Sequence, residues 1–442
     1  MSNAGDTSLT RRHLLAGSAA TAGALALPAI VPASALGRGG ALPPSERIIM
    51  AGIGLGGRGS GDLGWMLGEA DVRFVAVCDV HRGRREAAKA AVDGAYGNRN
   101  CAAYSDMTRL LAERTDVEGV LIATGDRWHA LASVLAMRAG KDVYCEKPAC
   151  LTMAQGQMVA DTARRYGRVY QTGAQRLSES NHVFAIEMAR SGRLGPIHTA
   201  YADIRWRDGA SRDWLPAEPE PPKNELDWDA WIGPCPWRPY NGGYVNGGGW
   251  YHQYDFATDV AMWGAHTVAQ ALAGLDMSRV TTIDFEFAGP DKTMVTRLSN
   301  GVKLVLFRSP GSVWDPCKLW HGACGERFDG PDGWAAAADG YAQPDVSTPA
   351  LLADFKKVVS EYTSRTQRPM NHVRDFLDCI RSRRQAVANP EVMVRSMCIC
   401  LAADICEQLK RSLKFDLRKA EFVGDPEANR LRSRAMRAPY TF

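Results

Sequence analysis

Residues 47–59 read RIIMAGIGLGGRG, in which a short apolar run leads directly into the glycine pattern G-x-G-x-x-G. The apolar run predicts a buried strand, and the residues after it predict a helix. Glycines at this junction allow a tight turn, close approach of the backbone to a pyrophosphate and close packing of helix on sheet. The stretch therefore predicts a dinucleotide-binding loop, formed by Gly54, Gly56, Gly57, Arg58 and Gly59.

Asp79 ends the next predicted strand, about 20 residues after the last glycine of the loop. A carboxylate at this position accepts hydrogen bonds from the adenosine 2′-hydroxyl and repels a 2′-phosphate, so it favours NAD over NADP. Arg82, Arg84 and Arg85 follow closely and offer the alternative of a clamp for the extra phosphate of NADP. We expect NAD, with NADP as the alternative.

Short apolar runs alternate with helical patterns up to residue 173, which is typical of a parallel, doubly wound sheet. The apolar runs cover 72–78, 119–123, 142–145 and 169–172, and the helical patterns cover 82–92, 106–114, 129–139 and 152–166. We therefore expect an α/β protein whose N-terminal Rossmann domain spans residues 47–173.

The pattern changes after residue 174, where apolar runs follow one another without a helix between most neighbours. They cover 197–206, 280–288, 294–299 and 302–307, and Asn300-Gly301 between the last two is a strong hairpin signal. We expect a C-terminal α/β domain for substrate binding and oligomerisation at 174–412, with a mainly antiparallel open sheet, and a tail at 413–442. The segments 206–250 and 309–349 are predicted to be long loops, and 372–383 and 390–409 are predicted to be helices.

The first residues have the features of an export signal. Arg11 and Arg12 precede an apolar stretch at 16–31, and Ala33-Ser34-Ala35 offers the small residues that a signal peptidase accepts. The alternative is a membrane anchor, but the stretch is shorter than the ~20 apolar residues that a span needs, and it is interrupted by Pro28 and followed by Pro32. We expect a twin-arginine signal at 1–35, a linker at 36–46, and a periplasmic or secreted mature protein without membrane contact.

Composition excludes several classes of function. The 442 residues contain 53 Lys and Arg against 49 Asp and Glu, and no basic run is interleaved with aromatics, so no nucleic-acid partner is expected. The 11 cysteines contain no C-x-x-C pair, which argues against a zinc ribbon. No cluster of His, Asp and Glu has convincing metal-ligand spacing, and no G-x-S-x-G elbow is present, so we expect neither a metal site nor a serine nucleophile.

Six motifs resemble those of the Gfo/Idh/MocA family of glucose-fructose oxidoreductases and inositol dehydrogenases, particularly its twin-arginine-exported bacterial branch. They are the glycine loop at 54–59, ATGDRWH at 123–129, CEKP at 145–148, GAQR at 173–176, LDWDAWIGP at 226–234 and WGAH at 263–266. The stretch from 372 through 430 is also similar. The resemblance implies a Rossmann domain, an α/β domain with an open sheet, and an active site in the cleft between them.

Lys147 follows a predicted parallel strand, at the carboxyl edge where open α/β sheets bind ligands. Its ammonium could exchange a proton with a substrate hydroxyl while hydride moves, and Pro148 stiffens the backbone that carries it. Glu146 is expected to orient Lys147 or to bind a ribose hydroxyl. By resemblance, three residues near the cofactor are Thr124, Trp128 and His129, although His129 has the alternative of a helix-starting histidine without chemistry.

His266 is the second expected catalytic residue, because the resemblance assigns the histidine of the WGAH motif to proton transfer. The family pattern there is Asp-x-x-x-His, yet this chain has Met262 four residues before His266. The nearest acid, Asp259, lies ~10.5 Å away along a helix. We expect Asp259 and His266 to contact substrate, and Met262 puts the proton relay and the identity of the substrate in question.

Further substrate contacts are expected from polar and aromatic residues near the cleft. Aromatic faces suit the C–H patches of sugars, and their polar tips reach hydroxyls. The candidates are Gln175, Arg176, Tyr251, His252 and Tyr254.

Together these features predict an exported oxidoreductase that carries its own nicotinamide cofactor and acts on a hydroxyl or carbonyl of a sugar, glycoside or cyclitol. Two alternatives remain: a glycosidase that oxidises C3 transiently and cleaves by elimination, and a redox-silent sugar-binding protein. An open sheet with helices on one face further predicts a homodimer or homotetramer.

Overall fold

The structure is a computed structural model that describes residues 42–442 except 205–210, 247, 290–292, 308–323 and 340–342. The chain divides into two compact units, 1–47 and 48–442. In the first unit the described residues form a short 3-10 turn, Pro44–Glu46, and the expected signal lies outside the described residues. All elements named below belong to the second unit.

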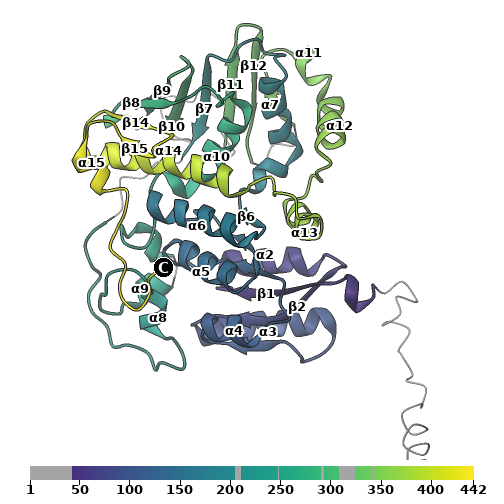
Figure 1. Cartoon of the computed structure of the whole chain (residues 1–442), viewed down its shortest axis with the longest axis vertical. Helices are drawn as coiled ribbons and strands as arrows, with labels where there is room; N and C mark the ends of the chain where they lie inside the picture. Colours follow the sequence, from purple (N-terminus) through teal and green to yellow (C-terminus); the bar gives the residue numbers. More distant parts are fainter. Residues whose placement is uncertain (1–41, 205–210, 247, 290–292, 308–323, 340–342) are drawn as a thin grey trace, which may run out of the picture. The chain divides into compact units, whose positions relative to one another are not determined.

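Residues 48–172 form a parallel sheet, as predicted, with six strands in the order β3-β2-β1-β4-β5-β6 (Figure 1). Five of these strands match predicted apolar runs, whereas the strand at 102–104 was not predicted. The strands are β1 (Ile48–Ile53), β2 (Val72–Cys78), β3 (Ala102–Tyr104), β4 (Gly119–Ile122), β5 (Asp142–Cys145) and β6 (Tyr170–Thr172). The crossover helices are α2 (Gly57–Leu67), α3 (Arg82–Tyr96), α4 (Met107–Glu113), α5 (Asp126–Arg138) and α6 (Met153–Tyr166).

The two faces of this sheet are covered by different parts of the chain. One apolar cluster joins α2 and α3 to Val373, Phe376 and Leu377 of α13 (His372–Ser382), a helix from the second half of the sequence. The opposite face packs against α5 and α6 within the large core, which continues into the second domain. Helix α14 (Pro390–Leu409) contacts both α6 and α10 (Ala261–Gly274), as Figure 1 shows, and so links the two halves of the unit.

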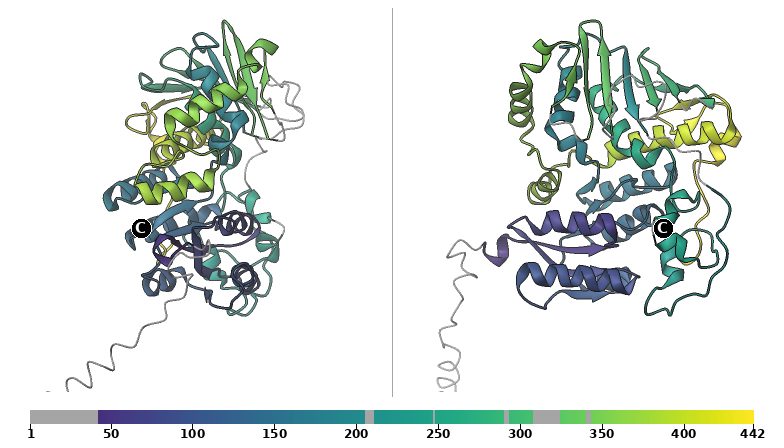
Figure 2. Two further views of the ribbon diagram at one scale, coloured as in Figure 1. Left: turned by 90° about the vertical axis from the view of Figure 1, so that its right-hand side faces the viewer. Right: turned by 180° about the vertical axis from the view of Figure 1, so that it is seen from behind.

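The second domain contains nine described strands in one mixed sheet, with the order β13-β12-β11-β7-β10-β9-β8-β14-β15. Only β7 and β10 pair in parallel among these strands, and the other pairs are antiparallel. The strands are β7 (Thr199–Asp203), β8 (Thr282–Phe285), β9 (Met294–Leu298), β10 (Lys303–Phe307), β11 (Glu326–Gly330), β12 (Gly333–Ala337), β13 (Asp345–Val346), β14 (Leu413–Asp416) and β15 (Glu421–Phe422). Figure 2 shows this sheet from two further sides.

Two boundaries differ from the sequence prediction. The expected loop at 309–349 contains β11, β12 and β13, and the expected tail from 413 contributes β14 and β15 to the sheet. Both differences have the same physical origin: these strands are two to five residues long, which is too short for a clear periodicity. Their attachment to the sheet depends on the pairing of β11 with β7 and of β14 with β8, which are distant in sequence.

Helices α7 (Ser180–Arg190) and α10 cover one face of the nine-stranded sheet, where Leu304 and Leu306 of β10 are buried in the large core. The other face carries a small apolar cluster that includes Tyr201, Phe307 and Trp334. Helix α12 (Phe355–Thr366) packs on α7. The remaining helical segments are η4 (Gln175–Ser178), α8 (Trp228–Ile232), α9 (Gly242–Val245), η5 (Gly249–His252), α11 (Pro349–Leu352) and α15 (Pro426–Arg430).

Within the part of the chain that the structure describes, no helix is both long enough and apolar enough to cross a membrane.

Candidate active site

Two glycines of the loop between β1 and α2, Gly54 and Gly59, have no room for a Cβ. Gly54 has a φ of +75°, which residues with a Cβ rarely adopt. A Cβ on Gly54 would lie 2.4 Å from Thr124 Cγ2, and one on Gly59 would lie 2.6 Å from the carbonyl oxygen of Gly54. Helix α2 begins at Gly57, so its unpaired backbone N–H groups lie beside the loop and are available to an anion.

Asp79 ends β2 and is almost fully buried. Its Oδ2 accepts the N–H of Leu55 at 2.9 Å and its Oδ1 accepts the N–H of His81 at 2.8 Å. Burial raises the pKa of Asp79, which the backbone hydrogen bonds partly offset. A carboxylate oxygen has a second lone pair, so Asp79 retains the capacity to accept a ribose hydroxyl.

The three arginines after Asp79 have different roles. Arg82 pairs with Glu86 and Glu225 on the surface, and Arg85 donates to the carbonyl oxygen of Asp79 at 2.7 Å. Arg84 lines the cavity described next and donates to Val245 O at 2.9 Å. Of the three, Arg84 is therefore placed where a phosphate on the adenosine ribose would lie.

A cavity of about 760 Å³ lies in front of the loop. Its walls include four of the predicted cofactor residues of the glycine loop, together with Asp79, Thr124 and Trp128. This volume is within the range of pockets that hold small molecules and cofactors. Residues far from the Rossmann domain in sequence complete the wall; they are Asp227, Ala230, Trp231, Val245, Gly248, Trp250, Tyr251, Pro439, Tyr440 and Thr441.

The part of the wall from 227–256 is held by stacked aromatic rings. Trp228 stacks on Trp231 with ring centroids 4.8 Å apart, and Phe256 meets Trp231 edge-on at 5.3 Å. The Arg127 guanidinium lies 3.6 Å from the Trp231 ring centroid and donates to the carbonyl oxygen of that residue. These contacts fix the 227–256 segment to the start of α5, which also lines the cavity.

The C-terminal residues close the same cavity from another side. Tyr440 donates to Asp229 Oδ2 at 2.7 Å, and its ring meets Trp128 edge-on at 5.3 Å. Arg437 pairs with Asp229 at 2.6 Å and donates to Gly233 O at 2.9 Å. The segment predicted to be a tail is thus fastened to the aromatic cover and contributes to the cavity wall.

The Cys-Glu-Lys-Pro motif follows β5, as predicted. Lys147 Nζ donates to Met262 O on α10 at 2.9 Å and lies 5.3 Å from the centre of the Trp263 ring. Glu146 is buried, and its Oε1 accepts a 2.6 Å hydrogen bond from Gln175 Nε2. The motif therefore joins the carboxyl edge of the parallel sheet to the helix that carries His266.

Glu146 is confined on two further sides. Arg58 Nε lies 3.4 Å from Glu146 Oε1, and a Cβ on Gly173 would lie only 2.3 Å from the same oxygen. Asp62 of α2, a residue that the sequence analysis missed, is fully buried and pairs with Arg58 at 2.8 Å. Burial and the charge of Glu146 raise the pKa of Asp62 to about 8. Asp62 therefore holds a proton near neutral pH, which limits the negative charge beside Glu146.

His266 lies on α10 and is buried. Its Nδ1 has no hydrogen-bond partner among the described residues. Burial, followed by the positive charge of Lys147, lowers the pKa of His266 well below its usual value. Lys147 binds the carbonyl of Met262, one helical turn before His266. A neutral imidazole with an unused ring nitrogen thus lies close to the ammonium.

Asp259 lies just before α10, and its negative charge acts on Asp404 of α14. Burial and the charge of Asp259 raise the pKa of Asp404 to about 7. The structure thus brings the charge of Asp259 close to α14, and its expected contact with substrate stays a prediction.

His129 and Tyr254 differ in placement from what the resemblance implied. His129 is buried, with Nδ1 2.6 Å from Pro148 O and Nε2 2.9 Å from Thr124 O, so it ties two motifs together beneath the cavity. The guanidinium carbons of Arg212 and Arg434 lie 4.0 and 3.8 Å from the centre of the Tyr254 ring. With these two cations on it, the ring has no open face to offer a sugar.

The other predicted substrate residues lie in two places. Tyr251 stacks on Trp250 with centroids 3.7 Å apart and lines the 760 Å³ cavity, and His252 is exposed nearby. Gln175 contacts Glu146, and Arg176 pairs with Asp339 beyond it. Gln175 and Arg176 thus lie near Glu146 and Lys147, whereas Tyr251 is part of the cavity wall.

Two family models match this chain. The model described as an oxidoreductase family with an NAD-binding Rossmann fold, GFO_IDH_MocA, matches residues 47–174. The model described as the C-terminal alpha/beta domain of the same oxidoreductase family matches residues 330–442.

The relatives named here match less than half of the chain. Inositol 2-dehydrogenase of Salmonella typhimurium is 34% identical over 147 residues, which are 32% of this chain and 41% of that protein. D-glucoside 3-dehydrogenase of Escherichia coli is 33% identical over 146 residues, covering 31% of this chain and 38% of that protein. A glycosyl hydrolase family 109 protein of Stenotrophomonas maltophilia is 32% identical over 197 residues, covering 43% and 40%. The chain thus spans about two fifths of the length of these relatives.

Solved structures match over most of the chain. The WlbA dehydrogenase of Chromobacterium violaceum, solved with NADH and UDP-GlcNAcA, has a TM-score of 0.58 at 16% identity and covers 84% of this chain and 97% of that one. Aldose-aldose oxidoreductase of Caulobacter crescentus has a TM-score of 0.53 at 18% identity and covers 84% and 100%. At this level of identity the likeness establishes the fold of both domains.

Proposed function

Because this chain belongs to the Gfo/Idh/MocA oxidoreductase family, we propose that it is an exported enzyme with a tightly bound NAD, acting on a hydroxyl or carbonyl of a sugar, glycoside or cyclitol. The observation that carries the proposal is the hydrogen bond from Lys147 Nζ to the carbonyl oxygen of Met262 on α10. Lys147 bonds to the turn before His266, and the two side chains lie at the carboxyl edge of the sheet whose glycine loop lines the nucleotide cavity.

The residues around the cavity fit a dinucleotide. The N-terminus of α2 supplies backbone N–H donors for the pyrophosphate, and Asp79 supplies an acceptor for the adenosine ribose. NADP would place its extra phosphate beside the buried carboxylate of Asp79, with Arg84 as the nearby cation. When bound, the nicotinamide accepts or returns the hydride of the alcohol carbon.

Lys147 and His266 are suited to move the hydroxyl proton that accompanies the hydride. The ammonium of Lys147 can donate a hydrogen bond to the substrate oxygen and exchange a proton with it. Burial and the Lys147 charge keep the ring of His266 neutral, so its unpartnered Nδ1 can accept a hydrogen bond from the substrate hydroxyl and orient it toward Lys147. Glu146 holds the strand end that carries Lys147 through its hydrogen bond from Gln175.

Retention of the cofactor is part of the proposal. An exported enzyme meets no dependable pool of free NAD, so the cofactor must stay bound and be regenerated in place. The fastened cover at 227–256 and the C-terminal residues 437–441 enclose the cavity and support slow release of the nucleotide.

Removing the Tyr440 side chain tests this cover. Tyr440→Ala loses the hydrogen bond to Asp229 and the edge contact with Trp128. Such an aromatic contact contributes about 0.5–1.5 kcal/mol, so we expect the nucleotide to dissociate about three- to tenfold faster. The rate is measured by trapping released nucleotide with an excess of a coupled dehydrogenase.

Tyr166→Ala, which removes a tyrosine 41% exposed at the end of α6, is the control and should release nucleotide at the wild-type rate. Equal rates in both variants would show that Tyr440 does not retain the cofactor.

A second candidate function is a glycosidase that uses bound NAD transiently, which the likeness to glycosyl hydrolase family 109 proteins favours. Oxidation at C3 would acidify the C2 proton, elimination would break the glycosidic bond, and the hydride would then return. Incubation with aryl glycosides in the absence of added NAD separates the candidates. Release of phenol indicates the glycosidase, a lasting change in nicotinamide absorbance indicates the dehydrogenase, and binding with neither indicates a redox-silent binding protein.

A homodimer or homotetramer remains part of the proposal. The outer face of the nine-stranded sheet carries the apolar residues Tyr201, Phe307 and Trp334, and a second copy is an economical cover for such a face.

A further inference from the structure

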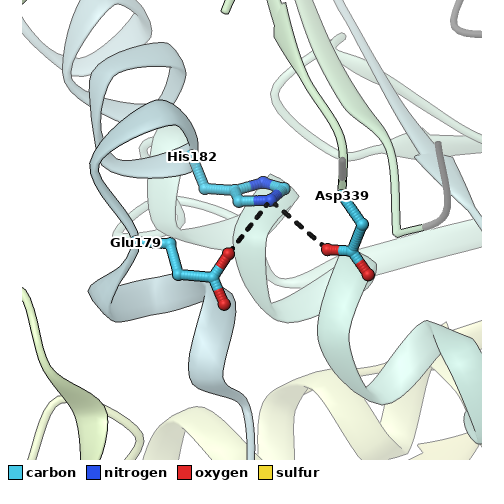
Figure 3. Close-up of side chains that lie close together, drawn as sticks. All are labelled: Glu179, His182 and Asp339. Atoms are coloured by element: carbon cyan, nitrogen blue, oxygen red, sulfur yellow. Dashed lines mark ion pairs between the residues drawn. The ribbon is translucent and has the colours of Figure 1, made fainter. Parts of the chain in front are cut away.

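A second cluster of polar side chains lies outside the nucleotide cavity, at the start of α7. Glu179 precedes the helix, His182 lies one turn along it, and Asp339 follows β12. Figure 3 shows the two carboxylates directed at the same edge of the imidazole. His182 Nε2 lies 3.9 Å from Glu179 Oε2 and 3.8 Å from Asp339 Oδ1. None of the three residues lines the nucleotide cavity.

The imidazole of His182 is held rigidly from its other side. Its Nδ1 lies 2.8 and 2.9 Å from the two carboxylate oxygens of Glu326, and both side chains are completely buried. Gln270 donates to Glu326 Oε2 at 2.7 Å and so fixes that carboxylate. Because carboxylate oxygens only accept, Nδ1 must donate its proton to Glu326.

Nε2 is therefore the ring nitrogen of His182 that is available to bind a metal ion. It is buried and has no hydrogen-bond partner within the described part of the chain, yet it is directed between two carboxylates. A histidine that donates one ring N–H to a carboxylate and presents the other nitrogen to further acidic ligands has the arrangement typical of metal-binding histidines. A purely structural histidine would place its second nitrogen within hydrogen-bond distance of an acceptor.

We propose that Glu179, His182 and Asp339 bind one divalent metal ion, of the class that combines imidazole and carboxylate ligands, such as Zn²⁺ or Mn²⁺. Three ligand atoms, one from each residue, lie within 4.8 Å of one another. One nitrogen and two carboxylate oxygens suit these ions better than Mg²⁺, which prefers oxygen ligands and keeps its waters. Three protein ligands leave at least one position open for water or another small ligand.

Exposure and charge are consistent with entry of a cation. The Glu179 side chain is 44% exposed and that of Asp339 is 27% exposed, so the ion has a path from solvent. The carboxylates of Glu179, Glu326 and Asp339 lie around the ring, so a cation meets negative charge there. Arg176 opposes a cation in part, because it pairs with Asp339 through both carboxylate oxygens, with Nε 2.9 Å from Oδ1.

The site is connected to the residues around Lys147. Arg176 joins Asp339 to Gln175 Oε1 at 3.3 Å, and Gln175 donates to Glu146. An ion at the cluster would therefore stand at the end of a hydrogen-bonded chain that leads to the Cys-Glu-Lys-Pro motif. Metal binding itself rests on the three ligands alone and is independent of the proposed enzymatic activity.

The test is direct measurement of metal binding by the tag-free, full-length protein. The protein is freed of metal with a chelator and titrated with ZnCl₂ and, separately, with MnCl₂, while elemental analysis after dialysis gives the bound content. We expect one ion per chain. Glu179→Gln removes an exposed ligand with little risk to folding and should weaken binding at least ~10-fold. His198→Gln removes an exposed histidine elsewhere and should leave binding unchanged.

A second variant and a spectroscopic readout distinguish loss of the site from misfolding and from binding elsewhere on the protein. His182→Asn should abolish binding, provided that circular dichroism shows the wild-type fold. Co²⁺ bound to the wild-type protein should give visible absorption bands that Glu179→Gln alters. A wild-type protein that binds no ion at a tenfold molar excess of ZnCl₂ or MnCl₂, or a Glu179→Gln protein that binds both ions as tightly as wild type, would overturn the proposal.

Discussion

Replacement of Lys147 by methionine is expected to lower turnover at least ~100-fold, the usual lower range for loss of a general acid or base. The bound nucleotide should remain at the wild-type level, because the residues that enclose it are untouched. Methionine has nearly the length of lysine and fills the same space beside Trp263, but it carries no proton and cannot bond to Met262 O. Turnover and nucleotide content are measured on the same preparation.

Two further variants make the Lys147 result specific. Lys147→Arg keeps the positive charge but holds its proton too firmly to exchange it, so its turnover should remain close to that of Lys147→Met. Lys357→Met changes an exposed lysine on α12 and should leave turnover unchanged. Wild-type turnover by Lys147→Met on a verified substrate would remove Lys147 from the mechanism.

Replacement of His266 by glutamine is expected to reduce turnover by roughly 10- to 100-fold, somewhat less than the loss of Lys147. Glutamine is polar and of similar reach, so it tests the hydrogen-bond-accepting nitrogen more than the volume of the side chain. Because the pKa of His266 lies well below its usual value through burial and the Lys147 charge, this ring stays neutral as pH falls through 7 and 6. The dependence of turnover on pH should therefore show no step from His266 in that interval.

His372 supplies the control for a buried histidine. Its Nδ1 lies 2.9 Å from Ser178 Oγ and its Nε2 lies 2.9 Å from Thr172 O, so both nitrogens are already engaged. His372→Gln should lower the melting temperature while the folded protein keeps its turnover. His266→Gln should show the reverse pattern. If both variants lose stability and neither loses turnover, His266 is a packing residue.

The parallel sheet could be predicted from sequence because its signals are local. Each strand of the Rossmann domain except β3 is an apolar run next to its crossover helix, and the glycine loop fixes where the first one ends. The missed strand β3 is only three residues long. Helix α7 was also missed, because seven of its eleven residues are buried and it lacks the polar face that produces helical periodicity.

Residues of the candidate site could be predicted from sequence only where they lie within a recognisable motif. The glycines and Asp79 lie in such motifs and, apart from Gly59, line the cavity. Glu146, Lys147 and His266 lie in others: Arg58 pairs with Glu146, and Lys147 bonds to the helix that carries His266. The roles of Tyr440, Asp62 and the Glu179 cluster depend on contacts between segments far apart in the chain. Glu179 and His182 are three residues apart, but their third partner, Asp339, is supplied by β12 packing on α7. The surroundings of Asp259 and Tyr254 could not be predicted for the same reason, since charged residues of α14 and the C-terminal segment contribute to them.

The central claim is that the protein turns over with a nicotinamide cofactor that it does not release. The most direct test is extensive dialysis of gently purified protein, followed by addition of glucosides and cyclitols with no NAD in the buffer, while nicotinamide absorbance and product are recorded together. We expect about one nucleotide per chain after dialysis, a rapid absorbance change no larger than the bound nucleotide allows, and continued turnover when a second sugar is present to take back the hydride. Protein that retains almost no nucleotide, and whose activity rises in strict proportion to added NAD, would contradict the account.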